Sequence, residues 1–175
     1  MPMGANDVRR DAVATPRPGH DRVAREGLPT MTPTEVGLIK ASWTAVEPIA
    51  DTAAELFYGR LFELDPALRR LFRRTDMAAQ RKVLMQTLAV VVKSLDRLDQ
   101  IVPAVQALGR RHAGYGVRAE HYETVGAALL WTLEQGLGDG FSPAVRDAWA
   151  QAYGTLASVM IDAAAADSQD TEAAA

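Results

Sequence analysis

Apolar residues between about positions 33 and 163 recur at spacings of three and four, which is the period of one face of an α-helix. The longest stripe follows Ser142 and Pro143 and keeps its period for about five turns. Its members are Val145, Ala148, Trp149, Ala152, Leu156, Val159 and Ala163. No stretch of the sequence shows the strict alternation of a strand. The pattern therefore predicts an all-α fold.

The boundaries of the predicted helices come from capping and turn residues. Thr32, Pro33 and Glu35 form a capping box, so the first helix begins there and runs to about residue 46. The others are expected at about 48–62, 66–72, 76–95, 99–113, 118–137 and from 143 onward. Gly114 and Gly116 end the fifth helix. We therefore expect seven helices joined by short loops.

Length and composition favour one domain. The chain has 175 residues, of which 48% are hydrophobic, and this is enough for a core of its own. We expect the domain at residues 31–166. Residues 1–30 show no apolar periodicity, and residues 167–175 are rich in alanine and acidic side chains, so both segments are expected to be disordered.

Charge and cysteine content exclude several classes of partner and site. The 19 basic and 22 acidic residues give a net charge of -3, so nucleic acid is not an expected partner. The longest apolar run, 88–92, is far shorter than the ~20 residues of a membrane span, and none is expected. The absence of cysteine excludes disulfides and thiolate metal sites. It is compatible with the cytoplasm, where we expect this protein.

Two polar side chains interrupt apolar stripes on different predicted helices. His112 continues the stripe of Ile101, Val105 and Leu108, and Gln80 lies within the stripe of Met77, Leu84, Leu88, Val91 and Leu95. A buried polar group without a hydrogen-bond partner costs about 1–3 kcal/mol, so these two groups are expected to bind a ligand or metal between them. The alternative for His112 is a hydrogen-bonded core residue.

The residue inventory limits what His112 could ligate. A zinc site needs three or four ligands, whereas this chain has three histidines, one of them in the segment 1–30, and no cysteine. A haem needs only one protein ligand, because the porphyrin supplies four nitrogens.

Several motifs and their spacing carry a family resemblance. Tyr58 lies fourteen residues before Phe72, and Gln80-Arg-Lys-Val-Leu84, Leu108-Gly-Arg-Arg-His112-Ala-Gly-Tyr-Gly-Val, His121-Tyr122 and Trp149-Ala-Gln-Ala-Tyr153-Gly follow. With these motifs, residues 34–161 resemble the bacterial single-domain globins and the globin part of flavohaemoglobins. The resemblance implies a globin fold, with the helices packed around a haem pocket.

The resemblance also implies a cofactor, haem b (iron protoporphyrin IX), and a set of residues that hold it. His112 would be the proximal iron ligand, with its other ring nitrogen donating to a carbonyl one turn back, that of Leu108. The other implied contacts are Phe72 on the porphyrin, Tyr58, Gln80 and Leu84 in the distal pocket, Tyr122 near His112, and Arg111 at a propionate. For Tyr58, a hydrogen bond to a backbone carbonyl is the alternative.

The implied function is a haem globin that binds dioxygen reversibly, binds carbon monoxide, and converts nitric oxide to nitrate. Tyr58 and Gln80 would serve this catalysis by hydrogen-bonding the gas. Because the chain ends before the flavin and nicotinamide domains of flavohaemoglobins, a separate reductase is expected to supply electrons. The alternative is a haem-based gas sensor or a partner-docking globin without turnover.

One feature departs from the family pattern. Many relatives carry a glutamate on the last helix that bonds the proximal tyrosine and histidine. Fifteen residues after Trp149 this chain has Ala164. Asp162 is two residues away, which turns it by about 200° around the helix, so strong electron donation to the iron is not expected.

Four arginines bracket Phe72: Arg69, Arg70, Arg73 and Arg74. Such runs are usually solvated helix-end charges. The alternative is a docking patch for haem propionates or for an electron-donor protein.

Overall fold

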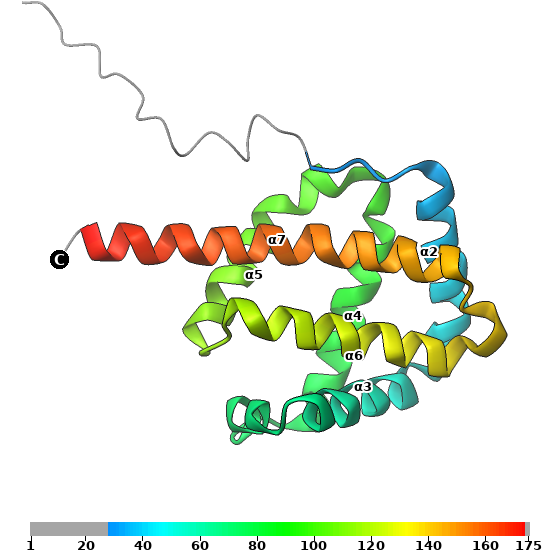
Figure 1. The fold of residues 1–175 in the computed structure, drawn as a ribbon, viewed down its shortest axis with the longest axis horizontal. Helices are drawn as coiled ribbons and strands as arrows, with labels where there is room; N and C mark the ends of the chain where they lie inside the picture. The colour runs from blue at the N-terminus through cyan, green and yellow to red at the C-terminus, as the bar shows by residue number, and fades with distance from the viewer. Residues whose placement is uncertain (1–27, 174–175) are drawn as a thin grey trace, which may run out of the picture.

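The computed structural model describes residues 28–173, and this part of the chain contains helices and no strand (Figure 1). The long helices are α2 (Pro33–Val46), α3 (Ala50–Leu64), α4 (Met77–Lys93), α5 (Leu98–Gly114), α6 (Ala119–Leu137) and α7 (Pro143–Ala173). Short 3-10 helices join them: η1 (Glu47–Ile49), η2 (Pro66–Phe72), η3 (Leu95–Arg97) and η4 (Gly138–Gly140). The all-α prediction is confirmed.

Helix α7 packs on α5, α2 and α6, and α3 packs on α6 and α4. Figure 1 shows α7, α6 and α3 as a row of helices that α4 crosses. Helix α4 thus rests mainly on α3 and α2, whereas α5 rests mainly on α7. The two helices that carry Gln80 and His112 are supported by different parts of the fold.

A buried tryptophan pair anchors the core between α2 and α7. The rings of Trp43 and Trp149 lie 6.3 Å apart, and Trp149 Nε1 donates a hydrogen bond to Ser42 Oγ at 2.9 Å. Aromatic pairs of this kind contribute about 0.5–1.5 kcal/mol beyond the area they bury. Ile39 and Leu133, both fully buried, belong to the same core.

Glycine sets the distance between α5 and α7. A Cβ atom at Gly109 would lie 2.4 Å from the backbone oxygen of Met160, so only glycine fits this crossing. Gly126 on α6 plays a similar role, because a Cβ there would lie 2.7 Å from the ring of Tyr153. The first contact fixes α5 one turn before His112.

The predicted caps agree with the structure. Glu35 N donates to Thr32 Oγ1 at 3.2 Å and Thr32 N donates to Glu35 Oε2 at 2.7 Å, which completes the capping box. Helix α5 ends at Gly114, and Gly116 turns the chain with φ +87°. The predicted helix 48–62 is divided into η1 and α3, and the predicted helix 76–95 ends at Lys93.

Two expected domain limits differ from the structure. Leu28, expected in the disordered segment 1–30, packs against the core, and Met31 beside it is 7% exposed. Helix α7 continues to Ala173, beyond the expected limit at residue 166, and residues 167–173 contain neither proline nor glycine to end it. Residues 1–27 and 174–175 lie outside the described residues. Within the described chain, every helix is too short or too polar to cross a membrane.

Candidate functional site

Tyr58 and Gln80 form a polar pair between α3 and α4. Gln80 Nε2 donates a hydrogen bond to the hydroxyl oxygen of Tyr58 at 3.1 Å, and Tyr58 is 6% exposed. Burial raises the pKa of the Tyr58 hydroxyl, and the Gln80 bond opposes this rise to a smaller extent. The hydroxyl therefore keeps its proton at neutral pH, and that proton is directed away from Gln80. The expected alternative, a bond from Tyr58 to a backbone carbonyl, is not the one found.

Phe72 lies against this pair at the end of η2. Its ring centroid is 5.6 Å from that of Tyr58 and 5.5 Å from that of Phe62, both in edge-to-face arrangements. Asp65 begins η2, because its side chain accepts a hydrogen bond from Ala67 N at 3.0 Å. This short helix therefore fixes the position of Phe72.

The apolar stripe of α4 is covered only in part by protein. Among the residues of α4, all of which the structure describes, Val92 alone is buried. Leu84, one turn after Gln80, is half-buried, as are Met77, Leu88 and Val91. Asp76 caps the helix through Ala78 N and Ala79 N, at 2.9 and 3.2 Å. The face that carries Gln80 is thus apolar, ordered and partly open.

His112 is half-buried on α5, and its ring is fixed by one hydrogen bond. Nδ1 lies 3.0 Å from the carbonyl oxygen of Leu108, as expected. Because a carbonyl can only accept, Nδ1 carries the hydrogen and Nε2 of the neutral ring keeps a lone pair. Burial lowers the pKa of His112, the positive charge of Arg111 adds to this effect, and the Leu108 bond opposes it. The donor set is therefore a neutral imidazole with one free ligating nitrogen.

Tyr122 lies on α6 and packs, half-buried, against the small apolar cluster that Val105 forms with Val159 and Met160. Burial raises the pKa of its hydroxyl. Leu108 borders the same cluster, which places Tyr122 on the α5 side of the site. The backbone carbonyl of Tyr122 accepts a hydrogen bond from the Tyr153 hydroxyl at 2.5 Å.

Three further residues bear on the surroundings of His112. Arg111 is exposed. On α7, Asp162 is exposed and Ala164 is half-buried, so the acid nearest to the family's glutamate position faces solvent.

The structure thus brings Tyr58, Gln80 and Phe72 into direct contact and places Leu84 on the same face of α4. Within the described residues, no hydrogen bond or ring contact links His112 to this group. The ring of His112 instead lies beside that of Tyr115, with centroids 6.4 Å apart, and the sequence pattern assigned Tyr115 no role.

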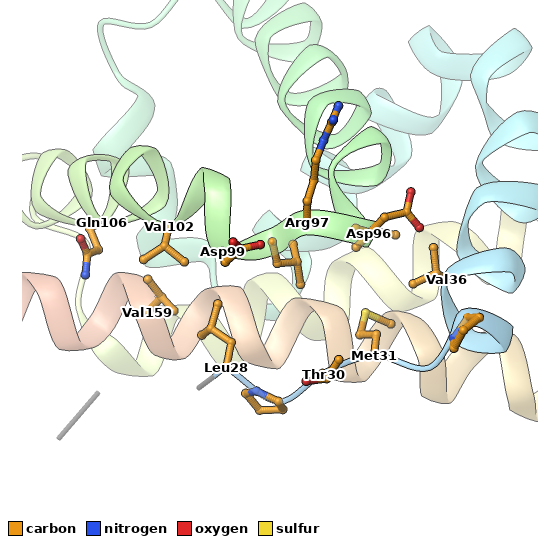
Figure 2. Close-up of a pocket in the computed structure, with 14 residues that line it drawn as sticks. Leu28, Thr30, Met31, Val36, Asp96, Arg97, Asp99, Val102, Gln106 and Val159 are labelled. Carbon is orange, nitrogen blue, oxygen red and sulfur yellow. The ribbon is translucent and has the colours of Figure 1, made fainter. Parts of the chain in front are cut away.

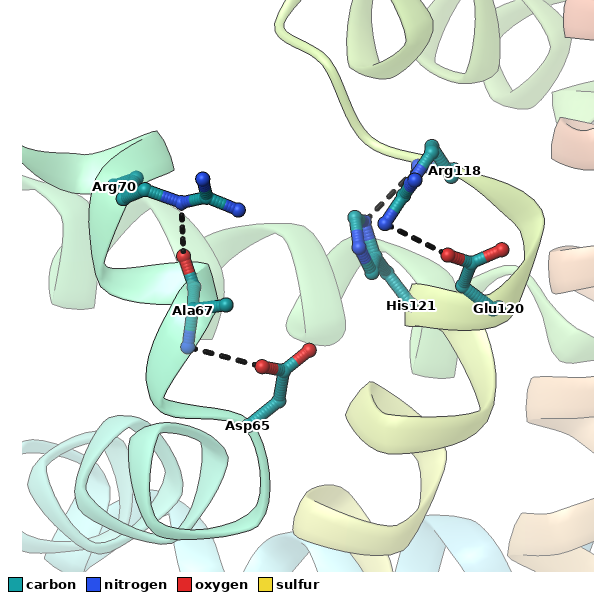
Figure 3. A network of polar contacts seen from close by, with 6 residues as sticks. All are labelled: Asp65, Ala67, Arg70, Arg118, Glu120 and His121. Atoms are coloured by element: carbon teal, nitrogen blue, oxygen red, sulfur yellow. Dashed lines mark hydrogen bonds and ion pairs between the residues drawn. The ribbon is translucent and has the colours of Figure 1, made fainter.

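His121, which the sequence offered only as part of a motif, has a defined local role in the structure. It lies at the start of α6 and is only 8% exposed. Its Nδ1 accepts a hydrogen bond from Arg118 N at 3.0 Å (Figure 3). The three-residue spacing of a helix cap was the signal that could have indicated this role.

A large cavity, of about 730 Å³, lies elsewhere, between residues 28–36, the start of α5, and α7 (Figure 2). It is lined by Leu28, Met31 and Val102 together with charged side chains such as Arg97 and Asp99. None of the site residues expected from the sequence lines it. We therefore keep the candidate site at Tyr58, Gln80 and His112, the polar groups that lie on apolar faces of α3, α4 and α5.

Comparison with a family model finds the Globin family over residues 55–160. The flavohemoprotein of Bacillus subtilis is 31% identical over 128 residues, which cover 72% of this chain and 32% of that protein. The flavohemoprotein of Vibrio cholerae is 31% identical over 134 residues, covering 75% of this chain and 34% of that protein. The chain spans about a third of the length of these relatives.

Two solved structures are similar in fold. A bacterial globin from Campylobacter jejuni matches 79% of this chain and 99% of its own, with a TM-score of 0.69 and 24% identity. An engineered carbene transferase, derived from a candidate nitric oxide dioxygenase of Rhodothermus marinus, matches 82% of this chain and 99% of its own, with a TM-score of 0.73 and 25% identity.

Proposed function

The chain belongs to the globin family, and from this premise we propose that it binds haem b through His112 and uses it to bind dioxygen reversibly. The observation that carries the proposal is the state of His112. Its Nδ1 hydrogen is held by Leu108, and its lowered pKa leaves the ring neutral, so Nε2 is free to ligate iron.

The side chains assigned to the site have the apolar chemistry that a flat apolar cofactor needs. Helix α4 presents the half-buried Leu84 and Leu88, η2 presents Phe72, and α5 presents His112 from a different part of the fold. An apolar macrocycle placed between these elements would cover side chains that protein covers only in part. Burial of that surface stabilises a complex by roughly 25 cal/mol per Å² of apolar area removed from water.

When bound, haem supplies an iron atom that ligates diatomic gases and exchanges single electrons. Tyr58 supplies the hydrogen-bond donor for the gas, because Gln80 donates to the Tyr58 oxygen and leaves the hydroxyl hydrogen unused. Gln80 orients that hydroxyl. Phe72 and Leu84 exclude water, which strengthens any hydrogen bond made in the site.

We further propose that the protein detoxifies nitric oxide by dioxygenation, with electrons from a separate reductase. Support comes from the relatives named flavohemoprotein and from the similar structure described as a candidate nitric oxide dioxygenase. In this proposal Tyr58 and Gln80 hold dioxygen in place, and carbon monoxide, which gains less from hydrogen bonding, competes for the same position.

The test begins with the absorption spectrum of the purified protein. We expect a Soret band from one haem per chain, and His112→Ala should lose it or require added imidazole to restore it. An unchanged spectrum in His112→Ala would refute the ligand assignment. Nitric oxide consumption is then measured with and without an added reductase. Stable dioxygen binding without reductase-dependent consumption would instead favour a sensor or carrier.

A further inference from the structure

Six exposed arginines lie on two segments that meet at one cavity. They are Arg69, Arg70, Arg73 and Arg74, in and after η2, and Arg111 and Arg118, at the end of α5 and before α6. Leu71 and Arg70 from the first segment and Gly116 and Arg118 from the second line a shared cavity of about 440 Å³. Figure 3 shows Arg70 and Arg118 on opposite sides of this gap. We call these six residues the arginine face.

The acidic residues near the first segment are largely engaged elsewhere. Asp65 caps η2, Asp76 caps α4, and Glu63 pairs with Arg60 at 3.2 Å. Across the gap, Glu120 pairs with Arg118 at 2.8 Å and offsets one charge. Arg73 and Arg74 make no ion pair with any described residue. Asp65 and Asp76 keep their negative charges as caps, but the six arginines outnumber these two and Glu120, so the face is locally positive in a chain whose net charge is -3.

The arginine face adjoins both sides of the candidate site. The guanidinium of Arg69 lies over the Phe62 ring at 4.9 Å, and that ring contacts Phe72. On the other side, Val117 N, between Gly116 and Arg118, donates a hydrogen bond to the backbone oxygen of His112 at 3.0 Å. A protein bound to this face would therefore contact segments that border both Phe72 and His112.

The composition of the face is typical of a protein interface. Tyr115, between Arg111 and Arg118 in the sequence, is 68% exposed. Tyrosine and arginine are the residue types that most often dominate binding energy at protein interfaces. A nucleic acid is a poorer match, because the acidic remainder of the chain would repel a phosphate polymer that extended past the face.

We propose that the arginine face is the docking surface for an acidic electron-donor flavoprotein. This proposal rests on the proposed haem-binding function and names the partner that serves it. With haem held by His112, transfer of one electron from the partner's reduced flavin would reduce the iron from ferric to ferrous and leave the flavin oxidised by one electron. Complementary charge orients the encounter and raises its rate, most strongly at low salt.

The test uses an acidic flavodoxin as the probe and two matched double variants. Arg73→Gln with Arg74→Gln removes two charges from the face. Lys82→Gln with Lys93→Gln removes two charges from exposed positions on α4 that form no ion pair with any described residue, which keeps the net charge the same in both variants. Haem content is first checked by absorption.

Two readouts are measured, at about 10 mM and at about 1 M salt, where the Debye length is roughly 30 Å and 3 Å. They are the second-order rate of haem reduction and the affinity for oxidised, dye-labelled flavodoxin by fluorescence anisotropy. At low salt we expect the arginine variant to lose about tenfold in both, and the lysine variant less than about twofold. At high salt all three proteins should react alike.

Equal losses in both variants, or no dependence on salt, would overturn the proposal. Tighter binding of a 20-nucleotide RNA than of flavodoxin, lost in the arginine variant, would also overturn it and assign the face to nucleic acid. If the protein holds no haem, the spectrum shows that the proposed function has failed. The anisotropy titration, which needs no haem, then still decides whether the face docks the acidic partner.

Discussion

Replacing Tyr58 by phenylalanine distinguishes the role of its hydroxyl from that of the Gln80 amide, because the change removes one oxygen and leaves the ring in place. The Tyr58 ring packs against Phe57 at 5.0 Å and Phe72 at 5.6 Å, and both contacts remain available to phenylalanine. The hydroxyl that accepts from Gln80 is lost. Tyr58→Phe thus removes the proposed donor to dioxygen with little change in packing.

The expected magnitude follows from the charge on the ligand. Dioxygen bound to ferrous haem carries partial negative charge, and a hydrogen bond to a charged group is worth about 1.5–3 kcal/mol. Loss of the Tyr58 donor should therefore accelerate dioxygen release by about 10- to 100-fold. Gln80→Leu should have a smaller effect, because the phenol remains and loses only the amide that orients it. Carbon monoxide release should change little in either variant.

Stopped-flow measurement of gas release from the wild type, both single variants and the double variant decides between the roles. Because Gln80 donates to Tyr58, the two effects should not add, and the double variant should resemble Tyr58→Phe. A change of less than about threefold in Tyr58→Phe, together with a large change in Gln80→Leu, would reverse the distal roles. The nitric oxide proposal would then depend on Gln80.

Three further predictions concern stability. Burial lowers the pKa of His112, so below about pH 6.5 the unfolded chain binds a proton that the folded chain does not. The stability of the apoprotein, measured by denaturation, should therefore fall as the pH falls through this range, and it should fall less in His112→Leu. An equal fall in both proteins would contradict the prediction. Gly109→Ala should lower the free energy of unfolding in urea by about 1–3 kcal/mol, because its Cβ would meet the α7 backbone at 2.4 Å. Gly37→Ala, with open space around it, should raise the free energy of unfolding by about 0.5–1 kcal/mol. Changes of the same sign in the two variants would refute this reasoning. Removing residues 1–27 should leave the melting temperature unchanged, whereas Leu28→Ala should lower it by about 2–4 °C, or roughly 1 kcal/mol. A lower melting temperature in the truncated protein alone would mean that the stabilising contact is made by residues before Leu28.

The helices were predictable because each carries its own periodic signal. The stripe that includes Trp149 and Leu156 defines α7 without reference to any other segment, and the Thr32 cap defines the start of α2. The limits near Leu28 and Ala173 were not predictable in the same way. Whether an apolar side chain beyond the last periodic residue packs depends on whether a distant helix offers a surface for it.

In the candidate site, too, contacts within one helix were predictable from the sequence, whereas contacts between helices were not. The Leu108 bond of His112 spans one helical turn, so helix geometry alone predicts it. The Gln80–Tyr58 bond joins residues 22 positions apart on two helices, and its direction depends on how α3 and α4 cross. His121 lines a cavity together with residues of η2, and no local pattern encodes this meeting of two distant segments.

The apolar stripes of α4 and α7 differ in how far protein covers them, and this difference bears on the stripe that contains Gln80. Both helices carry apolar stripes, yet protein buries most of the α7 stripe, including Val145 and Trp149, and leaves Leu84 and Leu88 on α4 half-covered. Stripes of similar composition are thus covered to different extents, because α4 is contacted mainly by α3 and α2, whereas α7 is contacted by α5, α2 and α6. A ligand that binds the folded protein stabilises it by RT ln(1 + [L]/Kd), so the gain grows with the logarithm of the ligand concentration over its Kd. With haem bound against α4 as proposed, occupancy of the site and stability of the folded protein would be one linked equilibrium.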